Sequence, residues 1–460
     1  MMSDTSQVDL LIKDALLVAT MDEHRREIQG GWVSINDGLI SGVGTSSEPP
    51  PPANRTITAT NCLVTPGFIN THHHMFQNLT RAFPPMTSAP LFEWLQTLYP
   101  LWSALDEEAA YLSAWIGLAE LALGGCTTST DHLYLHPAGA GDLITATITA
   151  ANELGMRFHP THGSMSLSEK DGGLPPDSVV RDDDEILAES ERLVGLHHDN
   201  SHGAMTRIAL APCSPFSVTP ELMTRTAELA ERLDVRLHTH LAENDQDDEF
   251  SMDQFGRMPV DQFAEVGWLQ DRSWVAHAVR LRDNDITRMA GAGVGVAHCP
   301  SSNMILSSGI APVSKMRSAG MAVGLGCDGS SSADSASLWQ EARTAMLLGK
   351  LSSGADSTNA RHALEMATRG GARCLGREGE IGELSVGAAA DVVLWQMDQL
   401  VFAGGIADPV ETLMRGGPAT AETTIVNGKP VVADGQLIHR DLASQMDRHR
   451  LAAARIQNTR

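Results

Sequence analysis

Short apolar segments alternate with helical segments between about residues 66 and 387. The apolar segments have the length of buried strands, and stretches with helical character separate them. This alternation predicts parallel βαβ units, and eight such units predict a closed (β/α)8 barrel, a TIM barrel of the α/β class. The eight predicted strands cover residues 69–74, 127–131, 157–162, 208–212, 235–240, 274–277, 294–298 and 323–328.

Polar side chains stand at the end of nearly every one of these strands. The active sites of (β/α)8 barrels lie at the carboxyl ends of the strands, so we expect these side chains to surround one pocket. In chain order they are His74, Asp131, His162, Cys213, His240, His277, His298 and Asp328.

Strand-like patterns also occur at both ends of the chain. Residues 8–12 and 31–35 precede the barrel, and residues 390–395 and 422–429 follow it. We expect the two ends to pair into a small β-sandwich domain beside the barrel, and a helix to cover about residues 441–456. The predicted division is 1–65 and 388–440 for the two parts of the sandwich, 66–387 for the barrel and 441–460 for the C-terminal helix and tail.

The composition narrows the possible partners. The chain of 460 residues has 33 basic and 57 acidic residues, a formal charge of −24. Such a surplus of negative charge argues against DNA, RNA or an anionic membrane surface as a partner. The six cysteines are scattered without a CxxC pair, which favours free thiols in a reducing compartment.

The chain shows no targeting or membrane-spanning pattern. The N-terminus has no basic segment followed by an apolar core, so we expect no signal peptide. The longest apolar window, residues 109–125, is interrupted by Glu120 and is too short to span a bilayer. We therefore expect a cytoplasmic protein.

A cluster of imidazoles at the end of the first predicted strand carries the first candidate chemistry. Side chains alternate between the faces of a strand, so His72 and His74 share one face and His73 lies on the other. Two imidazoles on one face are half of a divalent metal site, although a chance cluster in a polar loop would look the same in isolation.

Two further strand ends complete a predicted metal site. His240 ends the fifth strand and Asp328 ends the eighth, which lies next to the first in a closed barrel. His238 shares the face of His240 but lies one pleat deeper, so we expect it to support the ligands. Three imidazoles and one carboxylate suit Zn²⁺, with Fe²⁺ and Mn²⁺ as alternatives.

Two more residues are candidates for acid–base chemistry. Glu243 lies just beyond His240, where the strand gives way to a loop, and there it can face a bound water without being a ligand. A metal lowers the pKa of its water to about 7, and a nearby carboxylate can then take and return the proton. Glu243 could instead be a solvated loop acid. His277 ends the sixth strand, and its place on the same ring favours a catalytic over a structural role.

The motifs at these strand ends, taken together, resemble the amidohydrolase superfamily in its nucleobase and triazine deaminase branch. They are PGFxNxHxH, HxHLAE, AHAV, HCPSSN and GxGxDG, in this order along the chain. The resemblance covers nearly the whole chain and is specific, because five separate strand ends must agree in order and chemistry.

The resemblance implies one catalytic metal bound by His72, His74, His240 and Asp328. It also implies that Glu243 shuttles protons, that His277 polarises the water or the exocyclic atom of the substrate, and that Asp328 accepts a proton from the water. Binuclear members carry a bridging, carboxylated lysine, and residues 208–212 contain no lysine. A mononuclear site follows, which suits deamination better than the opening of an amide ring.

Substrate contacts are less well defined. Gln77 resembles the glutamine that reads a lactam edge in 8-oxoguanine and isocytosine deaminases, but it could simply be a polar residue of the following helical turn. Trp94 could stack on the substrate or pack within a lid-like helix, and His132 could line the pocket or hold a loop. Cys213 stands where adenosine and S-adenosylhomocysteine deaminases carry a histidine, which argues against a ribose-bearing purine.

The resemblance therefore favours a hydrolytic deaminase that releases ammonia from an exocyclic amine of a small N-heterocycle, with 8-oxoguanine and isocytosine as the preferred substrates. The first alternative is a hydroxylated s-triazine aminohydrolase that removes an alkylamine. Dechlorination is disfavoured because related chlorohydrolases can lack the acid pair that Glu243 and Asp328 provide here. A non-catalytic scaffold is a remote alternative, because scaffolds tend to lose metal ligands. We expect a homo-oligomer whose partners are the heterocyclic substrate and water.

Overall fold

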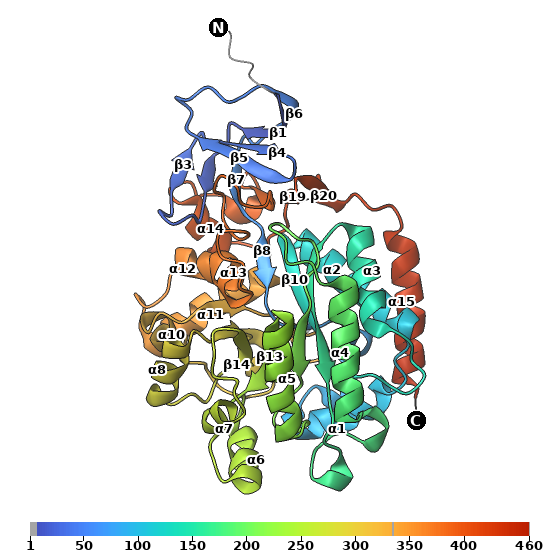
Figure 1. The fold of residues 1–460 in the computed structure, drawn as a ribbon. Coiled ribbons are helices and arrows are strands. Elements are labelled where there is room, and N and C mark those ends of the chain that lie inside the picture. Colours follow the sequence, from blue (N-terminus) through green and yellow to red (C-terminus); the bar gives the residue numbers. More distant parts are fainter. Residues whose placement is uncertain (1–6, 334, 460) are drawn as a thin grey trace.

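The computed structural model describes residues 7–333 and 335–459 and contains a closed barrel of eight strands (Figure 1). Each strand pairs in parallel with the next, and the last returns to the first. The predicted (β/α)8 fold is therefore confirmed. In barrel order the strands are β8 (Phe68–Asn70), β10 (Cys126–Leu133), β11 (Arg157–Ser164), β12 (Ala209–Pro212), β13 (Arg236–Leu241), β14 (Ser273–His277), β15 (Gly295–His298) and β16 (Val323–Leu325).

Helices cover the outside of the barrel (Figure 1). Several begin at a side chain that accepts a hydrogen bond from the first turn, as Asp106, Asp142 and Thr219 do. Such caps fix where each helix starts and hence where the preceding loop lies. The helices between the strands include α2 (Glu107–Leu123), α3 (Leu143–Leu154), α4 (Asp183–His197), α5 (Pro220–Leu233), α6 (Asp245–Phe255), α7 (Pro259–Glu265), α8 (Asp283–Ala292), α9 (Pro300–Ile305), α10 (Val313–Ser318) and α11 (Leu338–Ser353).

The first and last predicted barrel strands are each interrupted, which corrects their predicted extent. Residues 69–74 divide into β8 and β9 (His73–His74), and residues 323–328 reach only to β16 before β17 (Asp328–Gly329) begins. The Asn70 side chain lies at the break, where it donates to Ser129 Oγ at 3.1 Å and accepts from the backbone of Cys327 at 2.9 Å. β9 and β17 then pair with each other, so the ends of the first and last strands still lie side by side.

Two sheets lie beyond the barrel, on the side opposite to α6 (Figure 1). Strands from the two ends of the chain share one of them, because β7 (Cys62–Pro66) pairs with β18 (Val392–Gln396). The domain boundaries at residues 65, 387 and 440 stay a prediction. The remaining strands are β1 (Val8–Lys13), β2 (Leu17–Ala19), β3 (Glu27–Gln29), β4 (Trp32–Asn36), β5 (Leu39–Gly44), β6 (Ala53–Thr58), β19 (Thr423–Val426), β20 (Lys429–Ala433) and β21 (Gln436–Leu437).

A buried ion pair joins the barrel to these sheets. Arg157, at the start of β11, donates to both carboxylate oxygens of Asp391, at 2.8 and 3.0 Å. Both side chains are almost fully buried, and Asp391 also accepts from the backbone of Asn427. Loss of either partner would leave an unpaired buried charge, so this contact holds the floor of the barrel in place.

The C-terminal segment returns to the barrel. Helix α15 (Leu442–Gln457) packs against α2 and against the short helix η1 (Met75–Thr80) that follows the imidazole cluster. His449 contacts Asn78 Oδ1 at 2.8 Å and Gln457 donates to Leu79 O at 2.7 Å. Other helices are α1 (Leu91–Trp102), α12 (Ala360–Glu365), α13 (Gly371–Cys374) and α14 (Pro409–Arg415). Within the described residues, every helix is too short or too polar to cross a bilayer.

Candidate active site

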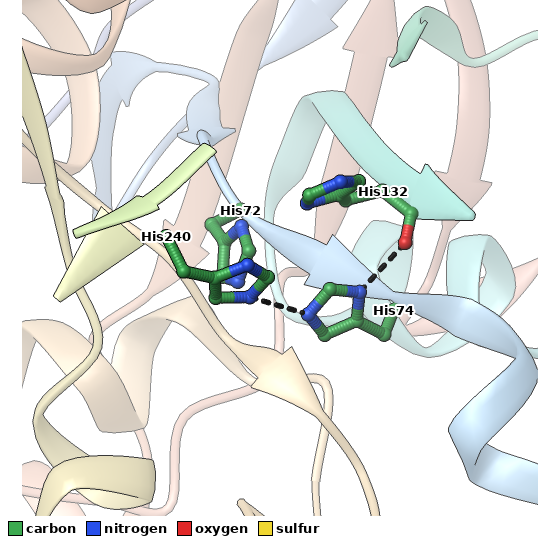
Figure 2. Close-up of side chains that lie close together, drawn as sticks. All are labelled: His72, His74, His132 and His240. Carbon is green, nitrogen blue, oxygen red and sulfur yellow. Dashed lines mark hydrogen bonds between the residues drawn. The ribbon is translucent and has the colours of Figure 1, made fainter. Parts of the chain in front are cut away.

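The structure brings the four predicted metal ligands together at the carboxyl end of the barrel. His74 Nε2 lies 3.1 Å from His240 Nε2, and both His72 Nε2 and His74 Nε2 lie 3.4 Å from Asp328 Oδ1. Figure 2 shows the rings of His72, His74 and His240 converging, the first two from the end of the first barrel strand and the third from β13. All four side chains are buried or nearly so, and bulk water therefore competes little for their donor atoms.

Backbone carbonyls fix the orientation of two of these imidazoles. His74 Nδ1 lies 2.7 Å from the carbonyl oxygen of His132 (Figure 2), and His240 Nδ1 lies 2.6 Å from that of Cys213. A carbonyl only accepts, so each Nδ1 carries the proton and each Nε2 is left with a free lone pair. Because burial lowers the pKa of both rings, they are neutral at pH 7.

His238 plays the same part for His72. His238 Nδ1 donates to the Trp274 carbonyl at 3.0 Å, so His238 Nε2 is an acceptor in the neutral ring. It lies 2.7 Å from His72 Nδ1, which therefore carries a proton and leaves His72 Nε2 unprotonated. Burial lowers the pKa of both rings. The expectation that His238 supports the ligands agrees with this contact.

With these tautomers, unprotonated Nε2 atoms converge on one point, where a cation can bind them. The Nε2 atoms of His74 and His240 are 3.1 Å apart, and neither carries a proton to form a hydrogen bond between them. His72 Nε2 is buried and has no hydrogen-bond partner among the described residues. Two nitrogens bound tetrahedrally at about 2.0–2.1 Å from one Zn²⁺ would be roughly 3.3 Å apart, close to the observed spacing. The donor set thus fits a divalent metal.

The carboxylate of the set is held in its charged form. Burial alone would raise the pKa of Asp328, but the neighbouring imidazoles of His72, His277 and His74 outweigh it and hold this pKa well below its usual range. Asp328 also has a left-handed backbone, with φ of 55°, and accepts from the backbone of Gly329 at 2.8 Å. Such strained positions occur where a structure over-determines the placement of a functional side chain.

Glu243 lies beside the ligands and is buried, at 3% exposure. Its Oε2 lies 3.6 Å from His277 Nε2, and its Oε1 accepts from Ser308 Oγ at 3.5 Å. Burial raises the pKa of Glu243 to about 7, since the favourable charge of His277 only partly offsets desolvation. A carboxyl group with this pKa can both give and take a proton near neutral pH.

His277 connects Glu243 to Asp328. Its Nε2 lies 3.6 Å from Glu243 Oε2 and 3.8 Å from Asp328 Oδ2. Burial opposes protonation, but the carboxylates of Glu243 and Asp328 outweigh it and raise the pKa of His277 above its ordinary value. Its Nδ1 lies 2.9 Å from Asn303 Oδ1, which orients the ring toward the cluster.

A small cavity opens beside this cluster, with a volume of about 30 Å³. Helix α1 forms one wall with Leu91, Trp94, Leu95 and Tyr99, and Phe216 packs at the same side against Phe92 of this helix. A space of this size is large enough for a water beside the ligands.

Gln77 and Tyr134 also line the cavity. The Oε1 atom of Gln77 is buried and has no hydrogen-bond partner in the described chain. Gly329 makes room for it, because a Cβ atom at this position would overlap the Gln77 carboxamide. An unpartnered carboxamide oxygen facing a cavity is a group that can accept from a ligand N–H.

The four predicted substrate contacts differ in where they lie. Gln77, Trp94 and Cys213 line the cavity, whereas His132 lies behind the ligands, with its ring stacked on His240 at 5.1 Å. The Nε2 of His132 bonds to the carbonyl of Ala211 at 3.0 Å. Its position favours the holding role that was the alternative to a pocket role.

Several cavity and support residues were not predicted. Tyr134, Phe216 and Ser332 line the cavity, and their spacing in the sequence gives no signal of this. Asn303 supports His277 and belongs to the HCPSSN motif, which could have identified it.

The comparisons with known proteins agree with this architecture. The model of the amidohydrolase family matches residues 63–431. This chain belongs to the amidohydrolase family. It is 46% identical over 425 residues to the 8-oxoguanine deaminase of Pseudomonas aeruginosa strain PAO1, covering 92% of this chain and 94% of that one.

Two further relatives extend the comparison. The chain is 35% identical over 428 residues to hydroxydechloroatrazine ethylaminohydrolase of Pseudomonas sp. strain ADP, covering 89% of this chain and 88% of the relative. The crystal structure of atrazine chlorohydrolase from Arthrobacter aurescens TC1 complexed with zinc superimposes with a TM-score of 0.92, at 32% identity, over 96% of this chain and all of that one. The predicted enzyme class, a hydrolase of C–N bonds other than peptide bonds, is thereby confirmed, and a divalent metal site is supported.

Proposed function

We propose that this chain is a metal-dependent aminohydrolase that releases ammonia from a small N-heterocycle with a ring lactam, of the 8-oxoguanine and isocytosine class. One observation carries the proposal: three unprotonated Nε2 atoms converge beside Asp328, with the acid–base pair of Glu243 and His277 next to them. The 46% sequence identity to an 8-oxoguanine deaminase, in an alignment that covers 92% of this chain, supports this substrate class.

His72, His74, His240 and Asp328 would hold one metal, with zinc preferred. When bound, the metal supplies Lewis acidity, which makes water a nucleophile at neutral pH. The carbonyls of His132 and Cys213 and the ring of His238 keep the three imidazoles in the tautomer that binding requires.

Glu243 moves the proton that deamination needs. Hydrolysis of a cyclic amidine adds water to the carbon bearing the amine, and the ring nitrogen must be protonated as this happens. With a pKa of about 7, Glu243 takes a proton from the attacking water and delivers it to the ring nitrogen. Asp328 takes the second proton of the water and passes it to the departing amine, which leaves as ammonia.

His277 stabilises the charge that develops during attack. Its raised pKa favours a protonated ring between the carboxylates of Glu243 and Asp328. A positive charge held here, in a site shielded from water, stabilises the negative charge on the oxygen that adds to the ring carbon. Asn303 positions His277 for this role.

Gln77 selects the lactam edge. Its free Oε1 accepts from a ring N–H, while its NH₂ group donates to the adjacent carbonyl of the substrate. A ring without this donor would leave the buried oxygen unpaired, which disfavours such a substrate.

A coupled assay of amine release tests the proposal. The metal-loaded protein is assayed with 8-oxoguanine, isocytosine, guanine, cytosine and a hydroxylated ethylamino-triazine, and both ammonia and ethylamine are measured. We expect turnover to be highest with 8-oxoguanine or isocytosine. Absence of turnover on oxo-purines and isocytosine would overturn the substrate class, and absence of amine release from every compound would overturn the reaction type.

A second candidate is removal of an alkylamine from a hydroxylated triazine. The apolar wall formed by Leu91, Leu95 and Phe216 could accommodate an alkyl group, and the ethylaminohydrolase relative supports this reading. Ethylamine release in the same assay, at a rate above that of ammonia release, would favour it.

A further inference from the structure

A second cavity, of about 260 Å³, lies at the other mouth of the barrel, where the strands begin. Ile208 precedes β12, Arg236 begins β13 and Arg272 precedes β14, so the lining comes from the amino ends of these strands. His159 of β11 and Gly376, just after α13, complete it. The cavity is separate from the catalytic cluster at the carboxyl ends.

The lining of this cavity is basic, although the chain as a whole is strongly acidic. Three arginines, Arg207, Arg236 and Arg272, face one acid, Asp234. Arg272 pairs with Asp234 at 2.8 Å at the edge of the cavity. Two positive charges therefore remain in the lining after this pair is formed.

The remaining positive charges are only partly neutralised. Arg207 lies 3.0 Å from Glu380, but Arg377 shares this carboxylate. Arg236 has no carboxylate within ion-pair distance in residues 7–333 and 335–459, and its hydrogen bond goes to the backbone carbonyl of Asp271 at 3.0 Å. Burial lowers the pKa of Arg236 to about 10, so it is still charged at pH 7.

Three buried side-chain nitrogens around the cavity have no hydrogen-bond partner among the described residues. They are Arg207 Nε, Arg236 Nε and His159 Nδ1. His159 is buried, at 1% exposure. Buried polar atoms without partners are rare and costly, and buried charges are normally paired.

The barrel interior holds Arg236 in place. Its guanidinium lies over the Trp274 ring at 6.0 Å, and Trp274 stacks in turn on His238 at 4.4 Å. The fork of a guanidinium held against an aromatic face is preorganised for an oxyanion. Donors that reach one space from several strands suit a tetrahedral oxyanion better than a planar carboxylate.

We propose that this cavity binds a phosphate-type oxyanion, either inorganic phosphate or the phosphate group of a small monoester, through Arg236 and Arg207 with His159. Such a ligand would neutralise Arg236 and satisfy the free donors. The proposal is independent of the reaction at the carboxyl ends of the strands.

Calorimetric titration of the metal-loaded protein tests this site. The probes are inorganic phosphate and ribose 5-phosphate, with sodium chloride at equal ionic strength as the reference. We expect saturable binding of at least one phosphate probe, weakened about tenfold or more by Arg236→Gln, since each lost charge-assisted hydrogen bond has about this effect. The probe that binds more tightly identifies the source of the phosphate group.

Two further variants keep the test decisive. Arg207→Gln removes the second arginine of the proposed site, so it reports on the site even if Arg236→Gln fails to fold. Arg440→Gln removes an exposed arginine elsewhere and serves as the matched control. Binding reduced by the cavity variants but not by Arg440→Gln supports the proposal. Absence of phosphate binding, or binding that the cavity variants leave unchanged, overturns it.

Discussion

His238 is buried behind the metal ligands, and its replacement tests how the ligand tautomers are set. In His238→Phe, the ring shape is kept but the acceptor for His72 Nδ1 is lost. In the metal-free variant, the His72 proton can move to Nε2, which lies 3.4 Å from Asp328. Metal binding requires a free Nε2, so it forces the proton back onto an Nδ1 that has no acceptor.

The size of the effect follows from that lost hydrogen bond. A buried donor left without an acceptor costs about 1–3 kcal/mol. Because about 1.4 kcal/mol corresponds to a tenfold change in an equilibrium constant, metal affinity should fall by roughly 10- to 100-fold. Partners that orient metal ligands in other proteins have effects of about this size.

Competition with a chromophoric chelator at fixed pH measures this affinity. We expect His238→Gln to recover most of the loss, because a carboxamide can accept from His72 and donate to the Trp274 carbonyl. His298→Phe is the matched control: His298 is also a buried histidine at a strand end, but its ring forms no hydrogen bond with a predicted ligand among the described residues.

The reasoning would be refuted by a His238→Phe variant that binds the metal within twofold of the wild type. Equal losses in His238→Phe and His298→Phe would also contradict it, since they would indicate a general loss of packing. Melting temperatures of the metal-free proteins separate the two cases.

Two other variants test the contact of Gln77 with the substrate and the ionisation of the buried Glu341. In Gly329→Ala, the new methyl group displaces the Gln77 carboxamide, so kcat/KM for 8-oxoguanine should fall about tenfold while metal content stays at the wild-type level. Glu341 is buried and accepts from Ser301 N at 3.0 Å, and burial raises its pKa from 4.5 to about 7. Because the pKa of Glu341 is higher in the folded protein than in the unfolded chain, the folded protein keeps the Glu341 proton to a higher pH. The stabilisation that this protonation contributes is therefore complete below pH 4.5 and is lost as the pH rises through 7. Glu341→Gln should remove up to about 3 kcal/mol of this pH dependence, measured as unfolding free energy in urea between pH 5 and 8.

Each of these variants has its own contrary outcome. Unchanged kinetics in Gly329→Ala with the metal bound would show that Gln77 does not read the substrate. Equal pH dependence of the wild type and Glu341→Gln would show that Glu341 ionises in the folded protein as it does in the unfolded chain. Because both proteins are compared at each pH, effects of pH on metal binding cancel in the second experiment.

The barrel and its ligands could be predicted because their signals are local. Most barrel strands are short runs rich in apolar or β-branched residues, and the spacing of His72 and His74 at the end of the first predicted strand indicated that the two share a site. The order of the strands then places Asp328 next to them, since the last strand of a closed barrel meets the first. These features need no knowledge of distant contacts.

Features that depend on distant contacts could not be predicted. Asn70 ends its strand because its side chain bonds to Ser129 and Cys327, which are far away in the sequence. The carbonyls of His132 and Cys213 orient two ligands, but a backbone carbonyl exists at every residue and leaves no pattern. The basic cavity likewise draws its arginines from separate strand ends.

The most direct test of the central claim is the rate of ammonia release from 8-oxoguanine by Glu243→Gln carrying one equivalent of metal. The amide keeps the size of Glu243 but cannot carry the proton, so we predict a fall in kcat of about 10²- to 10⁴-fold with metal content unchanged. A rate close to that of the wild type, with the metal bound, would contradict the account.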